Sequence, residues 1–142
     1  MGNQQERSAF NKGWVVGIID GEGSVLLTKK TLGYYPSIQI GNCNTGVIEK
    51  LTDILRFFEL PFYICRATKT KANKDFQRID IGGLKRLLHF FEVFPVELFE
   101  AKRSEIDLLS EYLKIRISKG ENAPFGSDED SIFHILKGYN GR

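Results

Sequence analysis

Apolar and polar residues follow two different periods along this chain, and the changes of period predict its elements. From about Ala9 to Asp20, apolar or small side chains recur at the three- and four-residue spacing of an α-helix. The segments 24–30 and 34–42 alternate as strands do, and a turn is expected near Leu32 and Gly33. A helix should therefore run directly into a β-hairpin.

The middle of the chain repeats this order of helix and hairpin. Asn44 can cap a helix that runs to Phe58, because apolar residues follow at positions i, i+3, i+4 and i+7. The segments 62–70 and 76–81 then read as a second hairpin around residues 71–75. The order up to this point is helix, two strands, helix, two strands.

The last third of the chain predicts three helices. A short helix follows Gly82 and Gly83, and a long helix runs from Pro95 to about Ile117. The residues expected to face inward on the long helix are Leu98, Ile106, Leu109, Tyr112 and Leu113. After a loop, Ser127 and Asp130 resemble a capping box that opens a final helix, which should stop at Gly138.

These elements indicate an α+β fold with four antiparallel strands and an αββαββα core. We expect one domain over residues 1–142, with the core at about 8–117 and a C-terminal extension at about 118–142. An antiparallel sheet that is covered by helices on one face leaves the other face free to meet a ligand.

Composition narrows the class of protein. Apolar residues make up 42% and charged residues 27% of the chain, which argues against disorder and membrane residence. The polar N-terminus lacks a signal-peptide pattern, so we expect an intracellular protein, either cytoplasmic or organellar, with no membrane partner. Cys43 and Cys65 lack metal-ligand spacing and are expected to be free thiols.

The net charge of +2 alone says little about nucleic-acid binding, but the distribution of charged residues along the chain says more. Residues 66–78 carry five basic side chains against the single acid Asp75, while residues 121–130 carry only acidic ones. A local basic footprint of this kind attracts phosphates. The alternative is an ordinary solvated hairpin.

Three glycines share one face of the first predicted helix. Gly13, Gly17 and Gly21 recur every fourth residue, and each glycine costs a helix roughly 1 kcal/mol relative to alanine. A second helix that packs very closely would explain them, since small residues at this spacing allow backbones to approach. Two such helices would bring two copies of Glu22 together, where a divalent cation could bind.

The decapeptide Val15-Val16-Gly17-Ile18-Ile19-Asp20-Gly21-Glu22-Gly23-Ser24 resembles the LAGLIDADG motif of homing endonucleases. The resemblance implies a saddle-shaped sheet with helices on its back, and an intron- or intein-encoded enzyme that cuts DNA at a specific site. Glu22 stands at the family's catalytic, metal-binding acid, and the carbonyl group of Gly21 is implied as a further ligand. Mg²⁺ or Mn²⁺ is the implied cofactor, and Mg²⁺ suits one or two carboxylates completed by water and phosphate oxygens.

Two further positions carry roles by the same resemblance. Asn42 aligns with a polar residue that helps to place water near the scissile phosphate, and Lys102 with a lysine that neutralises phosphate charge or polarises the nucleophilic water. For Lys102 the alternative is a solvated side chain paired with Glu105 at i+3. Asp20 is interpreted as structural support that caps local backbone amides.

Only one copy of the motif is present, which in the family implies a homodimer. The two-fold axis would join the glycine faces of Gly13, Gly17 and Gly21, and a long pseudo-palindromic DNA duplex would lie across both subunits. Both strands would be hydrolysed across the minor groove, leaving 3′ overhangs, and no small-molecule substrate is expected. The rival hypothesis is a non-cleaving protein of the same fold, such as an intron-splicing maturase or a transcription regulator.

Side chains with hydrogen-bonding groups are the candidates for reading bases in the major groove. The DNA-contacting residues that we expect are Thr28, Lys30, Gln39, Arg66, Thr68, Thr70, Lys71, Lys74 and Gln77. Arg66 could bind guanine in a bidentate way, whereas Lys71 and Lys74 at the hairpin tip would touch phosphates. Exposed strands commonly carry such residues without any ligand, so each assignment has that alternative.

Overall fold

The computed structural model describes residues 2–66 and 76–140, and it confirms the predicted order of helices and strands. The elements are α1 (Gly2–Glu22), β1 (Gly23–Lys30), β2 (Gly33–Asn42), α2 (Thr45–Phe57), β3 (Tyr63–Arg66), β4 (Gln77–Gly82), α3 (Leu84–Val93), a 3-10 turn (Val96–Leu98), α4 (Arg103–Lys119) and α5 (Ser127–Asn140). None of the described helices is long and apolar enough to cross a membrane.

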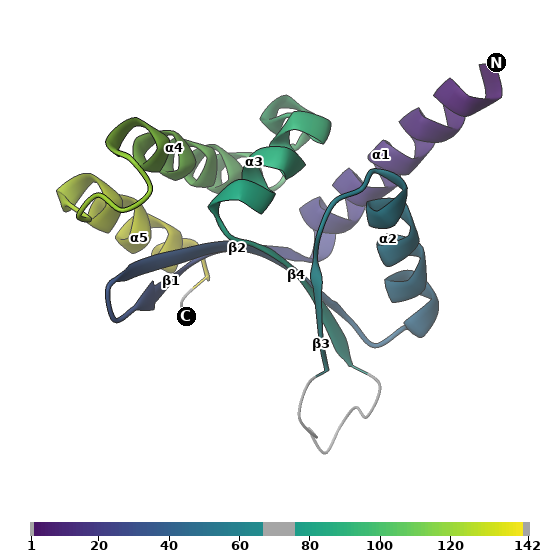
Figure 1. The fold of residues 1–142 in the computed structure, drawn as a ribbon. Helices are drawn as coiled ribbons and strands as arrows, with labels where there is room; N and C mark the ends of the chain where they lie inside the picture. Colours follow the sequence, from purple (N-terminus) through teal and green to yellow (C-terminus); the bar gives the residue numbers. More distant parts are fainter. Residues whose placement is uncertain (1, 67–75, 141–142) are drawn as a thin grey trace.

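The four strands form one antiparallel sheet in the order β1-β2-β4-β3, and helices cover one side of its curved surface (Figure 1). Side chains alternate between the two faces of a strand. The strand residues that face the helices are fully or almost fully buried: Val25, Leu27, Ile38, Ile40, Ile79 and Ile81. These residues fix which side of every strand belongs to the core.

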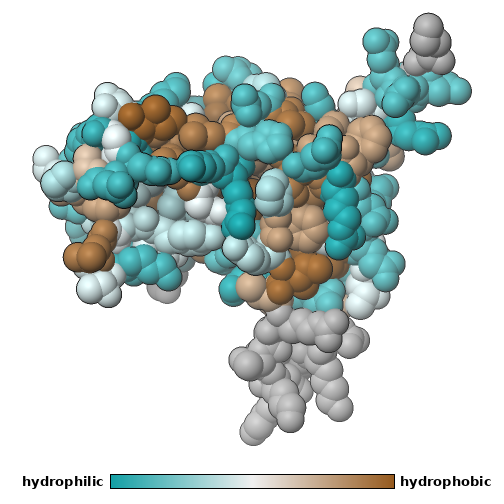
Figure 2. Space-filling view, viewed as in Figure 1, coloured by the Kyte–Doolittle hydropathy of each residue, from teal (hydrophilic) through white to brown (hydrophobic). Residues whose placement is uncertain are grey.

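Helix α1 is longer than predicted. It begins at Gly2 instead of about Ala9, and its first turns project away from the other elements (Figure 1). These turns carry mostly hydrophilic side chains (Figure 2). Only the second half of the helix is anchored in the core, through the fully buried side chains of Val15 and Ile19.

The long helix begins later than predicted. After Pro95 the chain makes a 3-10 turn, and α4 starts only at Arg103. Leu98 was expected to face inward but is 46% exposed, so that prediction is wrong, and Phe99 is the residue that is buried instead. The expectations for the other four inward-facing residues of this helix are confirmed.

The predicted capping box of Ser127 and Asp130 is also wrong by one residue. Helix α5 is opened by Gly126, whose backbone N–H donates to the carboxylate of Glu129 at 2.8 Å. The acid that accepts from the capping residue is therefore at the third helical position, as in a capping box. That acid is Glu129 and not Asp130.

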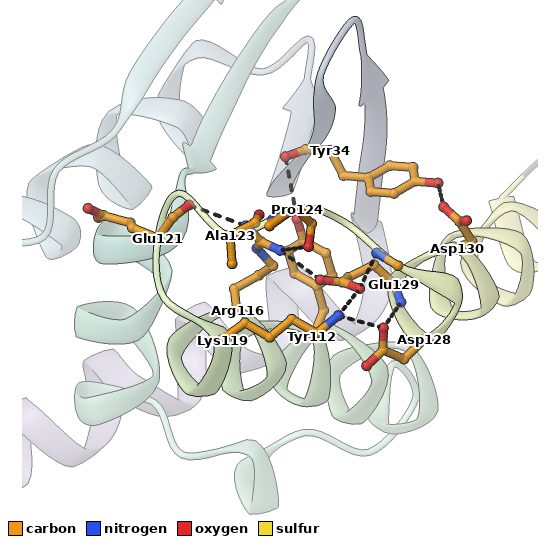
Figure 3. Close-up of polar contacts among 11 residues, drawn as sticks. Tyr34, Tyr112, Arg116, Lys119, Glu121, Ala123, Pro124, Asp128, Glu129 and Asp130 are labelled. Carbon is orange, nitrogen blue, oxygen red and sulfur yellow. Dashed lines mark hydrogen bonds and ion pairs between the residues drawn. The ribbon is translucent and has the colours of Figure 1, made fainter.

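Glu129 also anchors a buried ionic network that holds α5 and the preceding loop to α4 (Figure 3). Arg116 donates to Glu129 at 2.7 Å, and both side chains are almost completely buried. The guanidinium group also donates to the carbonyl groups of Glu121, Ala123 and Pro124 and lies over the ring of Phe125. A buried ion pair is tolerated only when its remaining hydrogen-bonding groups find partners, as they do here.

The same region supports the β1–β2 turn. Phe125 packs on Gly33, whose φ of +134° suits only glycine and whose missing side chain leaves room for the ring. Tyr34 donates to Asp130, and this hydrogen bond, together with burial, raises the pKa of Tyr34 to about 12. Helix α5 continues to β1, where the Asn140 amide donates to the carbonyl group of Val25 at 2.7 Å.

We predict that Arg116→Met lowers the free energy of unfolding by about 3–5 kcal/mol, because Glu129 keeps its buried charge but loses its partner. Chemical denaturation measures the loss. Arg103→Met is the matched control, since Arg103 forms an exposed pair with Asp107 and its loss should change stability by no more than about 0.5 kcal/mol.

The network also predicts the effect of acid. Burial alone raises the pKa of Glu129, but the hydrogen bonds around it outweigh burial and hold that pKa well below its ordinary value of 4.5. A lowered pKa stabilises the fold above pH 4.5, and this stabilisation is lost as the pH falls below that value. Stability of Arg116→Met should depend less on pH in this range; an equal slope would contradict the assignment.

Candidate active site

The corner between α1 and β1 fixes the position of Glu22. Helix α1 ends at Glu22 and strand β1 begins at the next residue, so no loop separates them. A Cβ atom on Gly23 would lie 2.7 Å from the carbonyl oxygen of Ile19. Because only glycine allows this approach, the exposed Glu22 side chain is held at a tight corner and not on a flexible connection.

Asn42 binds Glu22 directly. Its Nδ2 donates to Glu22 Oε2 at 2.8 Å, while its Oδ1 accepts from the backbone N–H of Asn44 at 2.7 Å. An N–H group can only donate, so the second contact fixes the amide with its NH₂ group toward Glu22. The structure therefore brings two of the three residues expected to be catalytic into contact.

Asp20 links the same corner to the start of α4. Its carboxylate accepts hydrogen bonds from the backbone N–H groups of Glu100, at 3.1 Å, and Lys102, at 3.0 Å. The expected capping of backbone amides is confirmed, but the amides lie about eighty residues away in sequence and are not local. Asp20 lies two residues before Glu22, so its hydrogen bonds hold the backbone of Lys102 near the corner.

The surroundings of Lys102 bear on its two interpretations. Lys102 is half-buried at the residue that precedes α4, and Glu105 is buried in the first turn of that helix. Burial raises the pKa of Glu105, and the charge of Lys102 acts in the opposite direction. The two charges are therefore close enough to interact, and the role of Lys102 in catalysis stays a prediction.

The glycine face of α1 is open. Gly13, Gly17 and Gly21 are exposed, and a Cβ atom added to any of them would meet nothing within 4 Å. Their face lies opposite Val15 and Ile19, which point into the core. Within the part of the chain that the structure describes, this face has no partner.

The face of the sheet that lies opposite the helices carries three of the predicted DNA-contacting residues. The register pairs Thr28 with Tyr35 and Ser24 with Gln39, all on this free face. Lys30 follows Thr28 by two residues and is exposed on the same face. Their placement agrees with expectation, and their contact with DNA stays a prediction.

Gln77 does not share that face. It lies two residues before Ile79, which is buried against the helices, so Gln77 belongs to the helix side of β4. The expectation that Gln77 lies on the free face together with Gln39 is wrong, because the alternation along β4 is shifted by one residue from the one expected. Arg66 pairs with Gln77 through its backbone. The predicted residues Thr68, Thr70, Lys71 and Lys74 lie outside the described residues.

Sequence reasoning missed a polar cluster on the free face. Asp80 is only 8% exposed and accepts a hydrogen bond from Gln39 Nε2 at 2.8 Å across the β2–β4 pair. Ser37 and Arg78 occupy the neighbouring rows of the same face. The sequence feature that could have revealed this cluster is the alternation of Ile79, Asp80 and Ile81. It places Asp80 on the face of β4 that does not belong to the core.

A divalent metal ion is implied by the resemblance, and one chain meets that requirement only in part. Among the described residues, no group of three His, Cys, Asp or Glu side chains is arranged to hold a metal. Glu22 is exposed at the corner and Asn42 occupies one of its two oxygens, so one oxygen is free to bind a cation. Cys43, in the bend after β2, and Cys65, on β3, are free thiols.

We predict that Asp20→Ala removes the protection of the Glu100 and Lys102 amides against hydrogen exchange and costs roughly 1–2 kcal/mol of stability, as the loss of a helix cap does. Amide exchange followed by NMR measures both effects. Asp107→Ala, at an exposed position of α4, should leave these two amides protected. Unchanged protection in Asp20→Ala would contradict the proposed link.

Known structures show what this architecture is similar to, although no protein-family model and no curated protein matches the sequence. The meganuclease I-AabMI bound to uncleaved DNA superposes with a TM-score of 0.67 at 18% identity, over 89% of this chain but only 43% of that one. The archaeal intron-encoded homing endonuclease I-Vdi141I in complex with DNA gives 0.65 at 13% identity, over 93% and 98%. The homing endonuclease I-CvuI, with a DNA target and Mg, gives 0.61 at 16% identity, over 92% and 77%.

These likenesses extend over 89% to 93% of the chain. At identities below 25% they establish architecture and not activity. The chain has the LAGLIDADG homing endonuclease fold.

Proposed function

We propose that this chain is a single-motif LAGLIDADG homing endonuclease that hydrolyses both strands of a long, pseudo-palindromic DNA site as a homodimer. The observation that carries the proposal is the hydrogen bond of Glu22 to Asn42 at the rigid α1–β1 corner. It joins the two side chains that the resemblance assigns to metal and water, next to the exposed glycine face. The structural neighbours crystallised with DNA support the choice of substrate.

The division of roles follows from the chemistry of the residues. Glu22 provides a carboxylate for the metal, and Asn42 keeps that carboxylate in one orientation. Lys102, whose backbone Asp20 holds near the corner, provides positive charge for a phosphate. A divalent metal, when bound, activates water and stabilises the leaving oxygen. I-CvuI was crystallised with Mg and with Ca, which supports a divalent cation as cofactor.

The homodimer follows from counting carboxylates. One chain contributes one Glu22 at one corner, whereas cleavage of two strands needs the site twice. An exposed three-glycine face lets a second α1 helix approach closely, and both Glu22 side chains then lie at the same end of the contact. A two-fold pair of sheets fits a pseudo-palindromic site with 3′ overhangs after cleavage.

The non-cleaving alternative, a maturase or transcription regulator of the same fold, uses the same sheet but needs no acid at the corner. The fixed Glu22–Asn42 pair favours the nuclease. Selection from a randomised duplex library, followed by incubation of the bound duplexes with Mg²⁺, tests the proposal. Cleaved products with 3′ overhangs support it, and stable binding without any cleavage supports the alternative.

We predict that Glu22→Gln retains DNA binding in Ca²⁺ and loses cleavage in Mg²⁺ by a factor on the order of 10³ or more, because it removes the charge that holds the metal. Binding and cleavage of the selected duplex measure the two effects. Glu49→Gln, at an exposed site on α2, is the matched control and should cut normally. Cleavage by Glu22→Gln at a near wild-type rate would refute the role of Glu22.

We predict that Gly17→Leu converts the dimer into monomer or aggregate, because the added side chain keeps the two α1 backbones apart. Sedimentation velocity measures the change. Gly138→Leu is a matched control, since Gly138 is also exposed in a helix with nothing near its missing Cβ atom. A stable dimer in Gly17→Leu would place the interface elsewhere.

A further inference from the structure

An aromatic side chain continues the exposed glycine face of α1 toward the N-terminus of the helix. Phe10 precedes Gly13 by three residues and Gly17 by seven, so the three residues share one side of α1. Phe10 is 62% exposed, whereas Val15 and Ile19 on the opposite side are fully buried. An exposed apolar residue is ordinary by itself. Its position at the end of the three-glycine surface is what calls for an explanation.

Helix α2 holds the Phe10 ring from one side. The Lys50 ammonium group lies 5.1 Å from the centre of the Phe10 ring and 4.9 Å from that of the Trp14 ring. A cation at this distance is attracted to the face of an aromatic ring. Phe10 nevertheless stays mostly exposed. The neighbouring helix therefore orients Phe10 without burying it.

The geometry of a glycine-mediated helix pair leaves a gap that matches the Phe10 ring. Helices that meet through small residues at every fourth position cross at an angle of about 40°. If the middle glycine, Gly17, marks the crossing, the two helix axes diverge toward both ends of α1. The helical rise puts Phe10 about 10 Å before the crossing, where the axes are offset by roughly 7 Å. Aromatic rings pair at centroid separations of about 4.5–7 Å, so the gap has room for one ring from each copy.

We propose that Phe10 of each copy packs against Phe10 of the other across the two-fold axis, and that this contact sets the angle at which the two α1 helices cross. Glu22 lies on the other side of the same crossing, about 7.5 Å beyond Gly17. A change in the crossing angle therefore changes the distance between the two carboxylates. Phe10 is thus a positioning residue, which acts on the metal site through the helix. The inference rests on the proposed homodimer and adds the residue that spaces its two Glu22 side chains.

A second copy of this chain is the occupant that the surface fits. A two-fold contact requires a surface that is complementary to itself. Here an apolar ring lies beside a stretch of helix without side chains, and a second copy offers the same two features at the same spacing. Nucleic acid is instead bound mainly through cationic and hydrogen-bonding groups, which neither feature supplies. Among the described residues, one chain also has no complete set of metal ligands, so the site needs the carboxylate of a second copy.

The competing explanation is that Phe10 only joins α1 to α2 within one chain. Lys50 lies between the rings of Phe10 and Trp14, and in return Lys12 of α1 lies over the ring of Phe58, at 5.8 Å. In that case the loss of Phe10 lowers the stability of the chain but leaves the dissociation constant of the dimer unchanged. The two explanations therefore differ in a quantity that can be measured.

The first experiment is cross-linking in a chain whose own thiols are removed by Cys43→Ser and Cys65→Ser. A short bis-maleimide should join two copies of Phe10→Cys efficiently, at a protein concentration at which sedimentation shows a dimer. Gln5→Cys is the matched control, because Gln5 is also exposed on α1 but lies about 140° around the helix from Phe10. It should give few cross-links under the same conditions.

The second experiment measures the dimer without a reagent. Phe10→Ala should raise the dissociation constant by roughly 30-fold or more, the effect expected of an aromatic hot spot. Phe10→Leu, which keeps apolar bulk, should recover most of this loss. Ile135→Ala removes a half-exposed side chain from α5 and should change nothing. At concentrations where Phe10→Ala is still dimeric, its digestion of the selected duplex in Mg²⁺ should give a higher ratio of nicked to linear product, because the two Glu22 side chains are no longer correctly spaced.

The outcomes separate the two levels of the argument. If the wild type sediments as a monomer with and without its duplex, the proposed homodimer fails and the spacer fails with it. If the wild type is a dimer through the glycine face, but Phe10→Cys cross-links no better than Gln5→Cys and Phe10→Ala keeps the wild-type dissociation constant, this inference alone is overturned. A cross-link with an unchanged product ratio would retain the contact and overturn its effect on spacing.

Discussion

The contact between Gly23 and the last turn of α1 is the constraint on which the rest of the site depends. Gly23 has no side chain, so its backbone can approach the Ile19 carbonyl group and the helix can pass into β1 without a loop. Any larger residue at this position would collide with that carbonyl group. The backbone of Glu22 is then held at the corner, where Asn42 reaches the Glu22 carboxylate from the end of β2. A loop of even a few residues would let the carboxylate move away from Asn42, whereas functional side chains must be held to within about 0.5 Å.

The same corner organises a part of the chain that is remote in sequence. Asp20 takes the backbone N–H groups of Glu100 and Lys102, and these donors lie just before α4, where a helix has unpaired N–H groups to satisfy. One acid of the motif thus faces outward at the corner while the other binds protein backbone. Two acids separated by one residue can differ in role because the last turn of α1 points them in different directions.

Sequence reasoning worked best where one physical effect dominated and failed where two competed. The helical and alternating patterns located the sheet and the helices, because burial of one face sets the period. Leu98 was misplaced because a 3-10 turn interrupts the pattern, and Gln77 because a strand that alternates around a charged residue can be assigned in either phase. Asp80 was missed for the same reason: an acid between two isoleucines becomes meaningful only when the register places it opposite Gln39. The register depends on long-range pairing that a single sequence does not reveal.

The two buried polar clusters of this fold differ in how completely their hydrogen-bonding groups are paired. Behind the sheet, Arg116 and Glu129 are surrounded by carbonyl groups, an amide and the Lys119 ammonium group, so burial is compensated almost atom by atom. On the free face, Ser37, Arg78 and Asp80 each have one buried side-chain atom that finds no partner among the described residues. Each such atom costs about 1–3 kcal/mol, so the free face is less stable than a fully paired or apolar one would be. Among the described residues, the helix side of the sheet therefore compensates its buried charges more completely than the free face does.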